Sequence, residues 1–183
     1  MNIKIKNITQ ISIFTAILCI ISPLSIPLVP VPISLSSCII CIFSILFELK
    51  KTFLGILLHI IIGCIGMPVF SNFSSGFGVL LGSTGGYIVG YFFLAFFTYL
   101  GNKFGEKYFA HKILKLSVLL INIIIGNLIC YTLGIFWFSY VNKTSIYTAI
   151  LVGVVPFIFG DLIKIIFSIM ITKALKNRLK QFL

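Results

Sequence analysis

The residues best suited to chemistry are an aspartate and a lysine about one helical turn apart near the end of the chain. Asp161 and Lys164 lie inside a long apolar segment, and their spacing places both on one helix face. Inserting an ionised side chain at the centre of a bilayer costs about 2.5 to 3.5 kcal/mol. Pairing with an opposite charge reduces this cost. Two apolar residues at these positions would avoid it altogether. The pair therefore predicts a polar ligand site facing the interior of a helix bundle. A purely structural ion pair is the alternative.

A second polar cluster opens another apolar segment, at Gly82, Ser83, Thr84, Gly85, Gly86 and Tyr87. Thr84 is suited to cap a helix, and Gly85 with Gly86 would expose backbone N–H donors at its positive end. Tyr87 adds an aromatic wall with a hydroxyl group. The alternative role of the glycines is close helix packing, because positions 82, 86 and 90 form one ridge. The Gly-Lys-Ser/Thr ending of a nucleotide-binding loop is absent.

No catalytic or metal-binding set accompanies these clusters. The two other acids, Glu48 and Glu106, lie among lysines, where solvated ion pairs are expected. The five cysteines lie in apolar segments without a metal or redox framework, and His59 is expected to pack within its helix. The sequence therefore predicts a binding protein with no enzymatic activity, no metal and no cofactor.

The composition identifies the elements that must position these residues. Of 183 residues, 60% are hydrophobic and 9% charged, whereas a soluble domain carries about a quarter charged residues. A soluble monomer, a disordered chain and a disulfide-stapled module are excluded, and continuous apolar blocks exclude an alternating β-barrel. We predict an all-α integral membrane protein with a single domain, 1–183. Its six transmembrane helices are expected at about 8–26, 34–49, 52–66, 84–102, 116–140 and 150–174.

The basic residues predict the orientation of these helices. Twelve of the fourteen lie at one set of alternating helix ends: Lys4, Lys6, Lys50, Lys51, Lys103, Lys107, Lys112, Lys115, Lys173, Lys176, Arg178 and Lys180. Short loops rich in Lys and Arg stay in the cytoplasm, so both termini are expected inside. The net charge of +11 is explained by these basic cytoplasmic loops, which lie close to anionic lipid headgroups. No basic cluster occurs together with a soluble module, so the charge does not indicate nucleic-acid binding.

The loops on the opposite side are unusual for membrane connectors. Residues 27–33 contain three prolines, and residues 67–83 are rich in Ser and Gly, yet both segments are uncharged and partly apolar. Solvated connectors are normally polar, so these loops are expected to fold back over the outer end of the bundle. Ordinary turns stiffened by proline are the alternative.

Together these segments resemble a known family. The order Val31-Pro32-Ile33-Ser34, Gly66-Met67-Pro68-Val69-Phe70, Gly76-Phe77-Gly78, Leu81–Tyr87 and Gly160-Asp161-Leu162-Ile163-Lys164 is similar to the BioY family. Its members are the biotin-specific S components of energy-coupling factor (ECF) transporters. The resemblance covers nearly the whole chain, and it implies the same six-helix bundle with cytoplasmic termini.

The resemblance also implies a function and partners. The chain would bind biotin with high affinity at the outer face of a prokaryotic plasma membrane. It would then release biotin inward when docked on a transmembrane coupling (T) subunit driven by two ABC ATPases. Biotin would contact Asp161, Lys164, Ser34, Gly82 and residues Thr84–Tyr87. The two outer loops would cover it as a lid.

Two positions depart from the family pattern. Ser36 replaces a usual Gln, and the small-residue ridge that docks the T subunit is reduced to Ser12 and Ala16, followed by Ile20. An S component for another vitamin remains an alternative. So does a small membrane enzyme or scaffold with a catalytic or structural Asp161–Lys164 pair.

Overall fold

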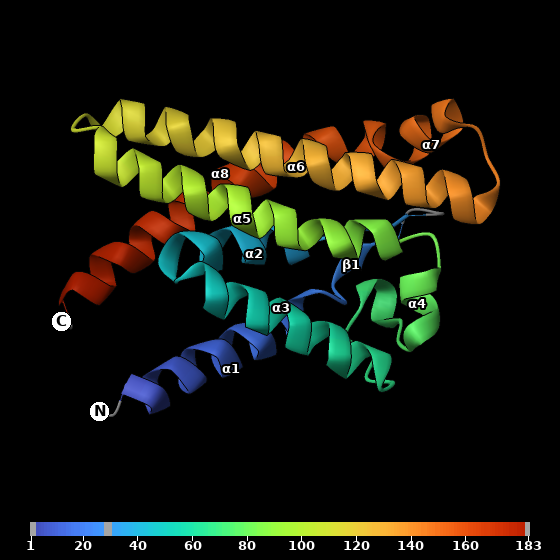
Figure 1. Ribbon diagram of the computed structural model, residues 1–183, viewed down its shortest axis with the longest axis horizontal. Coiled ribbons are helices and arrows are strands. Elements are labelled where there is room, and N and C mark those ends of the chain that lie inside the picture. The colour runs from blue at the N-terminus through green and yellow to red at the C-terminus, as the bar shows by residue number, and fades with distance from the viewer. Residues whose placement is uncertain (1–2, 28–30, 182–183) are drawn as a thin grey trace.

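The computed structural model describes residues 3–27 and 31–181, which form the predicted all-α bundle with one short β-ribbon. Figure 1 shows both ends of the chain at one end of the bundle and α4 and α7 at the other. The elements are α1 (Ile3–Ile21), β1 (Ser25–Ile26), β2 (Ile33–Ser34), α2 (Ser36–Leu46), α3 (Leu49–Cys64), η1 (Ser71–Phe73), α4 (Phe77–Leu81), α5 (Gly85–Tyr108), α6 (Lys112–Asn142), α7 (Ile146–Gly153) and α8 (Val155–Gln181).

The helices α1, α2, α3, α5, α6 and α8 follow the six predicted spans in order. Among the described residues, three segments are long and apolar enough to cross a membrane: Lys4–Ile21, Lys112–Asn142 and Ile146–Lys176. With 11 and 16 residues, α2 and α3 are shorter than the roughly 20 residues of a full crossing. The chain is therefore a multi-pass membrane protein whose second and third helices are shorter than the other four.

The first helix is displaced toward the N-terminus relative to the predicted span. It begins at Ile3 and ends at Ile21, whereas the prediction placed its end at Ile26. Pro23 explains the early end, because the residue before a proline avoids helical geometry. The chain then enters the ribbon, in which Ser25 pairs with Ser34 and Ile26 with Ile33.

The predicted sixth span is two helices. Helix α7 ends at Gly153, Val154 has a non-helical backbone (φ −131°, ψ −52°), and α8 begins at Val155. Pro156 lies in the first turn of α8, where a missing N–H is tolerated. The single span predicted over 150–174 is thus broken at Val154, and α8 starts five residues before Gly160.

Glycines allow α5 and α6 to lie side by side as an antiparallel pair (Figure 1). A Cβ atom on Gly86 would lie 2.5 Å from the Leu133 carbonyl oxygen, and one on Gly90 would lie 2.5 Å from the Cys130 sulfur. Neither distance is compatible with a side chain. The alternative interpretation of the glycine ridge, close helix packing, is confirmed at these two positions.

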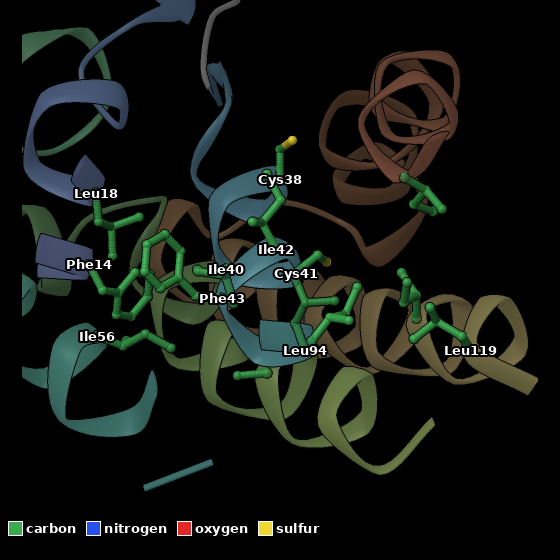
Figure 2. Packing of buried hydrophobic residues seen from close by; sticks show 14 residues of the cluster. Phe14, Leu18, Cys38, Ile40, Cys41, Ile42, Phe43, Ile56, Leu94 and Leu119 are labelled. Atoms are coloured by element: carbon green, nitrogen blue, oxygen red, sulfur yellow. The ribbon is translucent and has the colours of Figure 1, made fainter. Parts of the chain in front are cut away.

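The main core is a cluster of buried residues from α1, α2, α3, α5, α6 and α8, and its least exposed members include Phe14, Leu18, Ile40, Ile56 and Leu94. In Figure 2, Phe14 and Leu18 of α1 lie beside Ile56 of α3 and the aromatic ring of Phe43 of α2. The Phe14 and Phe43 rings stack with centroids 4.4 Å apart. This core holds the six long helices together, because α6 adds Ile123 and α8 adds Ile165 to it.

Both glutamates form the expected ion pairs with lysines. Glu106 near the end of α5 lies 2.6 Å from the Lys176 ammonium on α8, and Glu48 lies 3.9 Å from Lys51. The glutamate of each pair is exposed to solvent, so the pairs contribute little to stability. They occur at helix ends that the charge distribution assigns to the cytoplasm.

Candidate ligand-binding site

A cavity of about 360 Å³ lies between the two outer loops and helices α5, α6 and α8, a size typical of small-molecule sites. Its wall combines five aromatic rings with hydroxyl and amide groups and a single carboxylate–ammonium pair. The residues that line it are Ser22, Val31, Pro32, Ser34, Ser37, His59, Phe70, Ser71, Asn72, Ser74, Val79, Gly82, Ser83, Thr84, Tyr87, Ile88, Tyr91, Asn127, Cys130, Tyr131, Phe157, Asp161 and Lys164.

Asp161 and Lys164 both face this cavity, on the second and third turns of α8. The Lys164 ammonium donates to Oδ1 of Asp161 at 2.8 Å, and both residues are 8% exposed. The Tyr131 hydroxyl of α6 donates to the other carboxylate oxygen, Oδ2. The charges compensate each other, and the carboxylate keeps unused lone pairs, so the pair can bind a neutral group that both donates and accepts hydrogen bonds.

Ser34 lies in the cavity wall, but its hydroxyl is already hydrogen-bonded to other groups of the protein. It donates to the Ser22 carbonyl oxygen at 3.0 Å, accepts from the Ser36 backbone N–H at 3.1 Å, and lies 2.6 Å from the Ser36 hydroxyl. The Ser36 and Ser22 hydroxyls are also 2.6 Å apart. The departure at Ser36 therefore produces a compact serine cluster that ties α1, the β-ribbon and α2 together.

Tyr87 provides an aromatic wall, as expected, while its hydroxyl binds the protein. That hydroxyl donates to the Gly153 carbonyl oxygen of α7 at 3.0 Å, and the ring stacks with Phe157 at 6.4 Å. A Cβ atom on Gly134 would lie 2.3 Å from the Tyr87 ring. Tyr87 thus fixes α5 against α6 and α7 and presents a rigid ring face to the cavity.

The glycine cluster is divided between the cavity and the helix contact. Gly82 and Thr84 line the cavity, whereas Gly85 and Gly86 do not. A Cβ atom on Gly85 would lie 1.8 Å from the Leu80 carbonyl oxygen, and its N–H donates to the Gly82 carbonyl. Thr84 is the N-cap residue of α5, but its hydroxyl donates to the Val79 carbonyl at 3.4 Å and makes no cap bond. The backbone donor expected at Gly85 is therefore occupied within the protein.

The predicted outer loop 67–83 folds back over the bundle, but its second half contains the short helix α4. Phe70, 3% exposed, fills a slot that the absent side chain of Gly63 leaves open, and its ring meets His59 edge-on at 5.5 Å. The Ser25 hydroxyl donates to the side-chain oxygen of Asn72 and accepts from the Asn72 backbone N–H. These two hydrogen bonds join this loop to the β-ribbon. In the first loop, residues 28–30 lie outside the described residues, while Val31 and Pro32 line the cavity.

The predicted docking residues do not line this cavity, and they lie on the surface. Ser12 and Ala16 are exposed on α1, and Ile20 one turn further is 68% exposed. On the same helix Phe14 and Leu18 are buried in the core. The helix therefore presents its small residues outward, where a partner helix can reach them.

Several cavity residues were absent from the predicted site. Asn127 and Tyr131 lie one turn apart on α6, and Tyr91 follows Tyr87 at the same spacing on α5. Polar side chains in an otherwise apolar membrane helix normally face the interior, so this spacing was an available signal. His59 is packed as predicted, 1% exposed and 3.5 Å from the Cys19 sulfur, but it also borders the cavity.

The sequence of the chain is similar to those of known biotin transporters. The chain is 31% identical to the biotin transporter BioY2 of Lactococcus lactis subsp. cremoris, over 99% of this chain and 98% of that protein. It is 34% identical to the biotin transporter BioY of Thermotoga maritima, over 94% and 96%. The probable biotin transporter BioY of Rickettsia prowazekii is 34% identical, over 96% and 86%.

A solved structure shares the fold. The crystal structure of the S component for biotin from an ECF-type ABC transporter superposes with a TM-score of 0.82 and 27% identity, covering 96% of this chain and 93% of that one. The family model described as the BioY family matches residues 1–181. From its motifs, its fold and this match, the chain belongs to the BioY family.

Proposed function

We propose that this chain is the biotin-binding S component of an ECF-type ABC importer in a prokaryotic plasma membrane. The observation that carries the proposal is the match, over nearly the full length of both chains, to a solved S component for biotin. Relatives named as biotin transporters come from both bacteria and archaea. The chain would capture biotin and leave ATP hydrolysis to its partners, so it is a transport subunit and not an enzyme.

The chemistry of the cavity suits biotin. Biotin has a ureido group with two N–H donors and one acceptor, an apolar bicycle, and a carboxylate tail. Asp161 would accept from the ureido N–H groups, while Lys164 would donate to the ureido oxygen or hold Asp161 in place. The rings of Tyr87 and Phe157 offer apolar surface to the bicycle. Gly82 and Thr84 would contribute polar groups at the mouth.

Biotin titration of the purified, ligand-stripped protein in detergent tests this proposal. We expect tight, roughly one-to-one binding by calorimetry and no response to thiamine or riboflavin. Trp137 gives an optical signal, because its indole N–H donates to the carbonyl oxygen of Gly82, a cavity residue, at 3.0 Å. A folded sample that does not bind biotin would overturn the proposal.

We further propose that a T subunit and two ABC ATPases act with this chain, and that the α1 surface around Ser12 and Ala16 contacts the T subunit. Replacing Ala16 with Trp is expected to abolish co-purification with the T subunit, because a bulky ring blocks close approach of two helices. Biotin binding should be unchanged. Ile121→Trp on α6, at a position 56% exposed, is the matched control. Equal co-purification of both variants would exclude this docking surface.

A further inference from the structure

The carboxylate of Asp161 is held from two sides by residues of different helices. Lys164 occupies Oδ1 from the same helix, three residues later, and the Tyr131 hydroxyl occupies Oδ2 from α6. Tyr131 is half-buried and lines the cavity. We propose that Tyr131 is a positioning residue: it fixes the orientation of the Asp161 carboxylate so that its free lone pairs point at the ligand. The inference rests on the proposed function, in which Asp161 contacts biotin.

Lys164 alone would not fix this orientation. Lys164 extends from α8 on a long, flexible stem, so its ammonium can follow the carboxylate as it turns and their bond stays intact. The Tyr131 ring, in contrast, has only two rotatable side-chain bonds and is anchored on a different helix. Its hydroxyl therefore gives the carboxylate a fixed reference outside α8.

The position of Tyr131 in the fold supports this role. Helix α6 packs mainly on α5, and α8 packs mainly on α2, so the Tyr131–Asp161 bond connects two parts of the bundle across the site. The bond thereby couples the position of α6 to that of α8 at the cavity wall. About two of the four lone-pair positions of the carboxylate stay free for ligand N–H groups.

The chain offers an unusually clean test of this inference. Asp161 is its single aspartate, so aspartate labelled with ¹³C at the side-chain carboxyl reports this one group by NMR or infrared spectroscopy. The test variant is Tyr131→Phe, which removes only the hydroxyl. The matched control is Tyr140→Phe, on the same helix at a position 82% exposed. Both spectra are recorded on ligand-free protein, and the biotin Kd is then measured by calorimetry.

We expect Tyr131→Phe to shift the Asp161 carboxyl signal and to weaken biotin binding about 10- to 100-fold, the effect of losing a hydrogen bond to a charged group. Tyr140→Phe should do neither. A carboxyl signal that Tyr131→Phe leaves unchanged would overturn the inference, as would a shifted signal with unchanged biotin affinity. If Asp161→Asn bound biotin with wild-type affinity, the proposed site itself would be wrong. Failure of the Tyr131 inference and failure of the proposed site therefore give different results.

Discussion

Asp161→Asn and Lys164→Met are each expected to weaken biotin binding by about 100-fold or more. Each change removes one partner of a buried charge pair that is 8% exposed on both sides, a loss typically worth about 2 to 5 kcal/mol in a binding site. Asparagine keeps the shape of the carboxyl group but loses its charge, and methionine keeps most of the length of lysine. Calorimetry with biotin measures both effects.

Folding must be separated from binding in this experiment. Breaking a buried ion pair costs about 3 to 5 kcal/mol of stability, because one charge is left uncompensated. The double variant Asp161→Asn with Lys164→Met removes both charges, so it should melt close to the wild type and still fail to bind. If both single variants bind biotin as tightly as the wild type, the site assignment is wrong even though the family assignment stands.

A modified ligand distinguishes the two ends of biotin at this pair. Biotin methyl ester keeps the ureido group and lacks the carboxylate charge. With the ureido group at Asp161 and Lys164, the Lys164→Met variant should lose the same factor in affinity for biotin and for the ester. A loss confined to biotin would instead place the carboxylate of biotin at Lys164.

The sequence was most informative where a single helix carries the whole feature. Asp161 and Lys164 are three residues apart, so helix geometry alone brings them together, and the cost of charge in lipid marks them as special. The loop 67–83 was recognisable because its apolar, uncharged composition is unlike that of a solvated connector. The structure brings these segments to one cavity.

Features that depend on a second helix were much harder to predict. The spacing of Asn127 and Tyr131 could have placed Tyr131 in the interior, but its bond to Asp161 depends on α6 bringing it there from 30 residues away. Gly85 and Gly86 fit two roles equally well in the sequence, since backbone donors and close packing both call for glycine. The positions of the Leu80 and Leu133 carbonyl groups decide in favour of packing. Likewise the break at Val154 falls inside the single span predicted over 150–174.

The glycine contact between α5 and α6 carries the second large expected effect. Gly86→Ala should lower the free energy of unfolding by about 1 to 3 kcal/mol, the usual cost of overpacking. The new methyl group would lie 2.5 Å from both the Leu133 carbonyl oxygen and the Trp137 Cβ. One of these neighbours is backbone, so relief requires the two helices to separate. Thermal unfolding in detergent measures this loss.

The same substitution should also weaken biotin binding, because α5 carries cavity residues immediately after the contact. Tyr87 follows Gly86 directly, and its ring packs against Gly134 of α6. Moving α5 outward would shift that ring relative to Asp161 on α8. Gly78→Ala is the matched control, since nothing lies within 4 Å of its new methyl group. If Gly86→Ala melts and binds like Gly78→Ala, the close approach of α5 and α6 is not what holds the cavity wall in place.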